Sequence, residues 1–96
     1  MMKVKEVRCI PLYNYRLVNM VHDGNEFAYY NDGQLETFEI YYLDDTRASG
    51  FRYSRCYKLS EGQVPPKKYA AELEFLKQEF NKIDWDAKMV EVKLTT

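Results

Sequence analysis

The chain has 96 residues, of which 46% are hydrophobic and 30% charged, and its formal net charge at pH 7 is −1. This length leaves no room for a second hydrophobic core, so we expect residues 1–96 to form a single domain. The composition excludes an intrinsically disordered chain, and the isoelectric point of 5.8 argues against a protein whose overall charge attracts nucleic acid.

The N-terminus is charged from Lys3 onward and lacks the apolar stretch of a secretory signal peptide. No segment approaches the roughly 18 consecutive apolar residues that a membrane span needs. We therefore expect a cytoplasmic protein without membrane contact, in which Cys9 and Cys56 are reduced and pack as small apolar residues.

Two short segments near the start of the chain have the composition of strands. Residues 3–12 and 15–21 are rich in Val, Ile, Leu and Tyr, and the residues from Pro11 to Asn14 separate them. Because proline is confined to strand edges, bulges and turns, this pattern predicts two short strands or one strand with a bulge.

A hairpin signal follows. The turn residues from His22 to Asn25 precede the aromatic segment 27–30. The tripeptide Asn31-Asp32-Gly33 then supplies a glycine, which accepts the positive φ of a tight turn. We expect the chain to reverse direction there.

The segment 35–43 is expected to form the next strand. Its residues Phe38, Ile40 and Tyr42 alternate with others and so share one face, whereas we expect Glu36 to be out of step with them. This pattern predicts a half-buried antiparallel strand.

The C-terminal part predicts one more strand, a helix and a closing strand. Residues 51–59 alternate as in a strand. Pro65 and Pro66 then suit the first turn of a helix, because the N–H groups of that turn have no partner within the helix and proline lacks an N–H. Apolar residues recur at steps of three and four along the helix expected at about 66–83: Tyr69, Leu73, Leu76, Phe80 and Ile83. Residues 89–94 alternate again and predict a strand that returns to the sheet.

These elements predict an α+β fold with an antiparallel sheet of about five to six strands and one C-terminal amphipathic helix. The helix has one apolar stripe and the sheet has one apolar face. We therefore expect the helix to pack on one face of the sheet, because that arrangement buries both apolar surfaces.

The sequence carries no motif of an enzyme or a metal centre. Its one histidine, His22, has no nucleophile near it in sequence, and Cys9 and Cys56 lack the paired spacing of zinc ligands. No glycine-rich phosphate-binding motif occurs. We therefore expect a protein that is not an enzyme, with no catalytic residues, no metal and no cofactor.

Charge is segregated along the chain. Residues 17–46 contain seven carboxylates and no Lys or Arg, whereas residues 47–68 contain six cations and one carboxylate. The segregation can be purely structural, because acidic and basic strands can pair across a ladder. It can also reflect a binding function, for which we consider three hypotheses.

The first functional hypothesis concerns the acidic, Tyr-rich hairpin of residues 23–45. Its carboxylates would steer association with a basic surface of another protein, and its tyrosines would anchor the complex. Because a basic surface commonly binds nucleic acid, this hypothesis describes a small inhibitor or accessory factor. The candidate partner-binding residues are Asp23, Glu26, Tyr29, Tyr30, Glu36, Glu39, Tyr41, Asp44 and Asp45.

The alternative is a binder of single-stranded nucleic acid that uses the segment 50–58, whose aromatic rings would stack on bases while its cations neutralise phosphates. The candidate residues are Arg47, Phe51, Arg52, Tyr53, Arg55 and Lys58. The acidic segment would repel a polyanion unless the two patches lie on opposite faces. A third hypothesis is a homo-oligomer, in which the acidic patch of one copy pairs with the basic patch of another.

Overall fold

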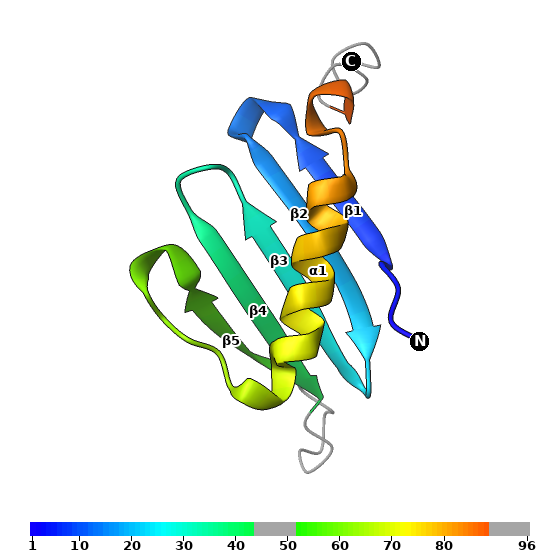
Figure 1. The fold of residues 1–96 in the computed structure, drawn as a ribbon, viewed down its shortest axis with the longest axis vertical. Coiled ribbons are helices and arrows are strands. Elements are labelled where there is room, and N and C mark those ends of the chain that lie inside the picture. The colour runs from blue at the N-terminus through cyan, green and yellow to red at the C-terminus, as the bar shows by residue number, and fades with distance from the viewer. Residues whose placement is uncertain (44–51, 89–96) are drawn as a thin grey trace.

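A meander of five antiparallel strands makes up the sheet of this protein, and one helix covers one of its faces (Figure 1). The computed structural model describes residues 1–43 and 52–88, with the side chains of residues 43, 52 and 53 left aside. The strands lie side by side in sequence order and are β1 (Glu6–Ile10), β2 (Tyr15–His22), β3 (Asn25–Asn31), β4 (Glu36–Leu43) and β5 (Arg52–Lys58). This confirms the predicted α+β class and the predicted antiparallel sheet.

The connections at one end of the sheet use local turn chemistry. After β1, a 3₁₀ turn, η1 (Pro11–Tyr13), ends at Asn14, whose φ of 51° lies in the left-handed region. Between β3 and β4, Gly33 has a φ of 93°, and the Asp32 carboxylate accepts the N–H of Leu35 at 2.7 Å. The first segment is therefore two strands, and the predicted hairpin at Asn31-Asp32-Gly33 is confirmed.

The helix α1 (Ala70–Lys82) follows a 3₁₀ turn, η3 (Lys67–Tyr69), so the helix predicted at about 66–83 is confirmed. The chain after Ile83 forms a further helical turn at residues 85–88. Among the described residues, no helix has both the length and the apolar character needed to cross a membrane.

The core lies between α1 and the sheet. Alternate residues of the three central strands face the helix and are buried: Val18, Met20, Phe27, Tyr29, Phe38 and Ile40. From the helix, Leu76 is fully buried, and the Phe80 ring meets the Tyr29 ring edge-on with centroids 5.2 Å apart. The Trp85 indole packs on Phe80 at 4.7 Å and donates its N–H to the Phe80 carbonyl at 3.0 Å. The turn after the helix is thereby tied to the same core.

Two expectations about single residues are wrong. Glu36 does not lie out of step with Phe38, since both point toward α1, where Glu36 accepts the Tyr29 hydroxyl and lies 4.0 Å from the Lys77 ammonium. Cys56 is exposed rather than packed, because it points away from the helix on an edge strand. The predicted closing strand, 89–94, lies outside the described residues.

We expect Leu76→Ala to lower the free energy of unfolding by about 2–5 kcal/mol, because it leaves a cavity where a fully buried side chain fills the space between helix and sheet. The matched control is Asn81→Ala on the exposed side of α1, which should change that free energy by about 0.5 kcal/mol or less. Urea unfolding measures both, and equal losses would contradict this packing of the helix.

Candidate functional site

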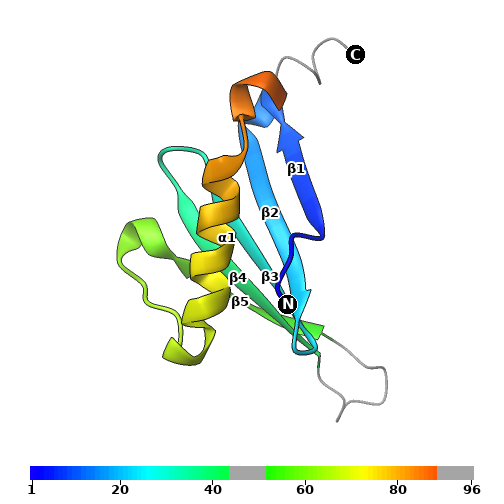
Figure 2. The ribbon, with the colours of Figure 1, turned by 45° about the vertical axis from the view of Figure 1, so that its right-hand side comes forward.

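No described helix or further strand packs on the face of the sheet opposite α1, and Figure 2 shows the helix on one side only. The pairing register aligns the outward-facing residues of β2, β3 and β4 in three rows across the strands. We call these residues, together with Tyr15 at the start of β2, the open face: Tyr15, Leu17, Asn19, Val21, Glu26, Ala28, Tyr30, Thr37, Glu39 and Tyr41.

Three tyrosines give the open face its shape. The rings of Tyr15 and Tyr30 are in contact, with centroids 5.2 Å apart. The Tyr30 hydroxyl donates to the Asp32 carboxylate at 2.8 Å, and the Tyr41 hydroxyl donates to the Glu39 carboxylate. Each of these two hydroxyls is thus held by a carboxylate two residues away in the chain. The rings are fixed in place before any partner arrives.

The same contacts shift the titration of these groups. Partial burial, followed by the hydrogen bond to a carboxylate, raises the pKa of Tyr30 and that of Tyr41 to about 12 each. Burial also raises the pKa of Tyr15. The backbone N–H groups of Leu35 and its neighbour lower the pKa of Asp32. At neutral pH the phenols are therefore neutral donors and Asp32 is charged.

Charge on this side of the sheet is arranged by strand. The central strands present Glu26 and Glu39 on the open face and no Lys or Arg. The cations that point to the same side belong to the edge strands: Arg8 on β1, paired with the Glu6 carboxylate, and Lys58 on β5, 3.8 Å from the Glu61 carboxylate. The open face therefore carries carboxylates at its centre, whereas each described cation at its borders lies beside a carboxylate.

The described residues of β4 and β5 do not place opposite charges directly across from one another. In the register, Glu39 lies opposite Cys56, while Lys58 lies opposite Thr37 and Arg55 lies opposite Ile40. No carboxylate in the described part of the β4–β5 ladder faces a cation directly. Among the described residues of this ladder, directly opposed charge pairs therefore do not explain the acidic and basic segments.

The structure divides the predicted partner-binding residues between two faces. Four of them lie on the open face: Glu26, Tyr30, Glu39 and Tyr41. Asp23 lies in the β2–β3 turn with its side chain exposed, and Asp44 and Asp45 lie outside the described residues. Tyr29 is buried in the core and Glu36 points toward α1, so both are removed from the candidate surface. Adjacent residues of a strand point to opposite faces, which separates Tyr29 from Tyr30.

Sequence reasoning missed Tyr15 and Leu17. Both come from β2, outside the hairpin that the charge pattern singled out, and both join the open face because β2 pairs with β3. The alternation of β2 carried the signal, since the buried residues Val18 and Met20 leave the odd-numbered positions on the other face.

The residues predicted to bind nucleic acid do not gather on one face. Arg55 pairs with Ile40 and so points to the helix side, whereas Lys58 pairs with Thr37 and points to the open face. The other four lie outside the described residues, either entirely or in their side chains: Arg47, Phe51, Arg52 and Tyr53.

His22 is a packing residue in this structure. Its Nδ1 lies 3.2 Å from the Glu72 carboxylate in the first turn of α1 and 3.7 Å from the Asp23 carboxylate. Glu72 is buried, so the contact ties the end of β2 to the start of the helix. The described residues contain no group of three His, Cys, Asp or Glu side chains that could hold a metal ion.

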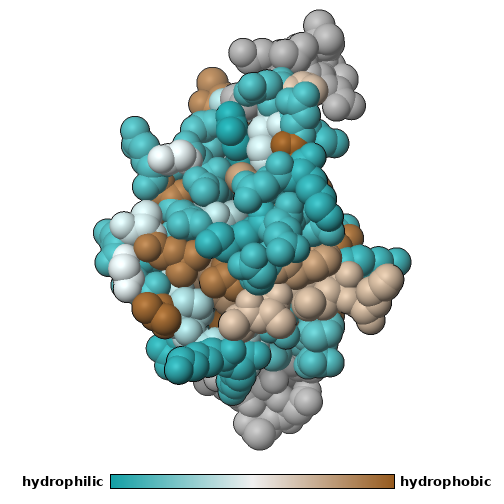
Figure 3. Space-filling view, in the orientation of Figure 1, coloured by the Kyte–Doolittle hydropathy of each residue, from teal (hydrophilic) through white to brown (hydrophobic). Residues whose placement is uncertain are grey.

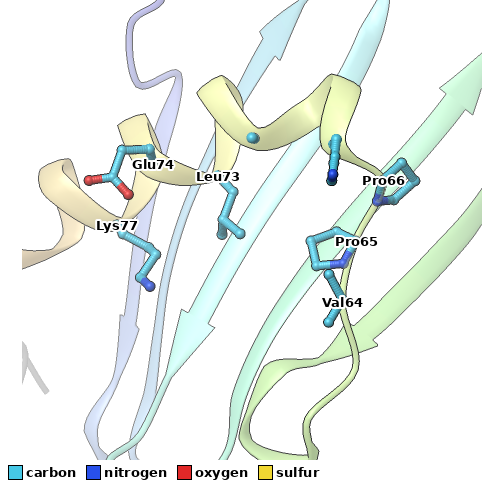
Figure 4. Close-up of a pocket in the computed structure, with 8 residues that line it drawn as sticks. Val64, Pro65, Pro66, Leu73, Glu74 and Lys77 are labelled. Carbon is cyan, nitrogen blue, oxygen red and sulfur yellow. The ribbon is translucent and has the colours of Figure 1, made fainter.

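A shallow groove lies on the helix side, where hydrophobic surface gathers beside the lower half of α1 (Figure 3). Its volume is about 270 Å³, and Figure 4 shows Val64, Pro65 and Pro66 opposite Leu73 of the helix. The charged residues that line it are Lys67, Glu74 and Lys77. Glu74 accepts a hydrogen bond from Gln78, and Lys77 lies beside Glu36, so no set of free polar groups converges in the groove.

Comparison with known protein families, curated proteins and solved structures finds no match for this chain. The open face is therefore judged on its geometry and chemistry. It combines ordered aromatic rings with carboxylates, an arrangement typical of surfaces that bind other macromolecules.

We expect Tyr30 and Tyr41 to lose their hydroxyl protons at about pH 12, compared with roughly 10 for an ordinary tyrosine. Because the folded state favours the protonated form, their contribution to stability is complete below about pH 10 and is lost as the pH rises toward 12. Absorbance titration of Tyr30→Phe and Tyr41→Phe should each show one fewer phenolate in the high-pH step. Loss from the ordinary step would contradict the two hydrogen bonds.

Proposed function

We propose that this protein is a non-enzymatic binding module that docks the open face of its sheet on a basic surface of another protein, where it acts as an inhibitor or accessory factor. One observation carries this proposal: on the central strands, ordered tyrosines lie beside Glu26 and Glu39 with no cation of those strands on the same face. Each part of that arrangement has a role in association.

The tyrosines supply the anchors. A tyrosine ring offers a large contact area with only two side-chain torsions to fix, and tyrosine is enriched where proteins bind one another. Here the Tyr15 and Tyr30 rings support each other, and the Tyr30 and Tyr41 hydroxyls are already bound. Docking therefore costs little further side-chain entropy.

The carboxylates supply direction. Glu26, Glu39 and the exposed Asp23 place negative charge on and beside the open face, which raises the rate of encounter with a positive surface. Many positive protein surfaces exist to hold nucleic acid, and a docked acidic face would exclude that polyanion. This is the physical basis for proposing an inhibitor of a nucleic-acid-binding protein.

Two other occupants suit the open face less well. In a dimer that pairs two open faces, Glu26 and Glu39 of both copies would lie in one interface, where like charges repel. Nucleic acid would meet those same carboxylates, and the described candidate cations Arg55 and Lys58 point to opposite faces.

The thiols support a cytoplasmic site of action. Cys9 and Cys56 are both free, and they belong to the two edge strands of the sheet, β1 and β5, on opposite sides of the molecule. A chain with two unpaired thiols, one of them exposed, suits a reducing compartment.

The proposal is tested by a tagged pull-down from the source cell's lysate, with and without nuclease treatment, followed by a salt step. We expect a protein that survives nuclease treatment and is released by salt. Glu26→Gln combined with Glu39→Gln should weaken its retention about tenfold at low salt, because two steering charges are lost. Glu74→Gln on the exposed side of α1 is the matched control and should change nothing.

Equal retention of the double variant and the wild type would contradict docking through the open face. Recovery of nucleic acid alone, or only of proteins lost on nuclease treatment, would favour the nucleic-acid alternative in its place.

A further inference from the structure

The connection between β1 and β2 exposes apolar side chains without any charge among them. No residue between Arg8 and Arg16 is charged, and the exposed fractions of Ile10, Leu12 and Tyr13 are 46%, 84% and 74%. We call these three residues the apolar tip. A contiguous apolar patch that remains exposed is typical of surfaces that contact another molecule.

The apolar tip is held in place by hydrogen bonds. The Asn14 backbone N–H donates to the Pro11 carbonyl at 3.0 Å, which closes the turn. The Asn14 side-chain amide donates to the Asp32 carbonyl, also at 3.0 Å, and so ties this turn to the one between β3 and β4. A surface that is ordered in advance loses less entropy when it binds.

The apolar tip continues the open face at one end of the sheet. Ile10 lies opposite Tyr15 in the register, and the Tyr15 ring contacts the Tyr30 ring. Figures 1 and 2 both show the β1–β2 connection at the same end of the molecule as the β3–β4 turn. One partner can therefore contact the tyrosines and the apolar tip together.

We propose that the apolar tip enters an apolar pocket on the same partner protein, next to the basic surface that receives the open face. This inference rests on the proposed function. The surrounding charge favours a protein over an anionic lipid surface. Asp32, whose backbone carbonyl accepts the Asn14 amide, carries a carboxylate in the neighbouring turn, and Glu39 lies on the adjoining face. The nearby cation Arg8 is paired with Glu6. An apolar pocket bordered by cations complements both the apolar tip and the carboxylates of the open face.

The two parts of the surface have separable effects on binding. Charges at the border of an interface act mainly on the association rate and on its dependence on salt. Apolar side chains buried in a pocket act mainly on the dissociation rate. The apolar tip and the open-face carboxylates can therefore be tested independently.

The first measurement is photo-crosslinking with the full chain in the source cell's lysate. A photoreactive phenylalanine derivative replaces Tyr13 in one variant, the exposed open-face residue Val21 in a second, and Gln78 on the exposed side of α1 in a control. We expect positions 13 and 21 to crosslink to one and the same polypeptide, and position 78 to give no such product.

The second measurement uses that polypeptide, purified, as the binding probe. Leu12→Ser with Tyr13→Ser should raise Kd roughly tenfold or more through faster dissociation, with unchanged salt dependence. Leu12→Met with Tyr13→Phe keeps the apolar surface and should bind as the wild type does. Because these side chains are exposed, an unchanged urea midpoint will show that the fold is intact.

The outcomes separate this inference from the proposed function. If position 21 crosslinks to a polypeptide but position 13 does not, or if the serine variant keeps its Kd, the apolar tip has no such role while docking by the open face stands. Products of position 13 with lipid, nucleic acid or a second copy of the chain would also overturn the inference. If neither position yields a polypeptide, both proposals fail.

Discussion

The packing of α1 on one face of the sheet is the constraint on which the other features depend. Leu76 and Phe80 bury the helix-facing side chains of the central strands, and Trp85 extends that layer past the end of the helix. Successive side chains of a strand point to opposite faces of the sheet. The side chains that pack against α1 therefore determine which side chains lie on the other face. The open face is thus the complement of the core, and its tyrosines lie there because their sequence neighbours are buried.

Local pattern was enough to predict the helix and the hairpins, because their signals lie within a few residues. The apolar steps from Tyr69 to Ile83 define one helical stripe, and Asn31-Asp32-Gly33 contains the residues that its turn requires. The alternation that puts Phe38 and Ile40 toward the helix also puts Glu36 there, so the expectation that it lies out of step did not follow from the pattern. Its partners, Tyr29 and Lys77, come from other elements and could not be identified from the strand alone.

The sequence predicted only part of the candidate site, because composition does not show which face of a strand is buried. Composition showed that residues 23–45 are acidic and aromatic, but deciding between Tyr29 and Tyr30 required knowing which face α1 covers. The fold also determines where the charges lie, since the described cations on the open-face side, Arg8 and Lys58, belong to the edge strands, whereas Glu26 and Glu39 belong to the central ones. Charged edge strands also discourage unwanted pairing with other sheets.

The order of the strands has a consequence for how the chain is made. Each of the five described strands pairs, within the described part of the chain, with its neighbours in sequence, so the hairpins can form one after another as the chain leaves the ribosome. The helix follows these strands in the chain. The nascent sheet therefore exposes two faces, one destined for α1 and one for solvent, and the apolar one remains open to chaperones and to aggregation until the helix has been synthesised.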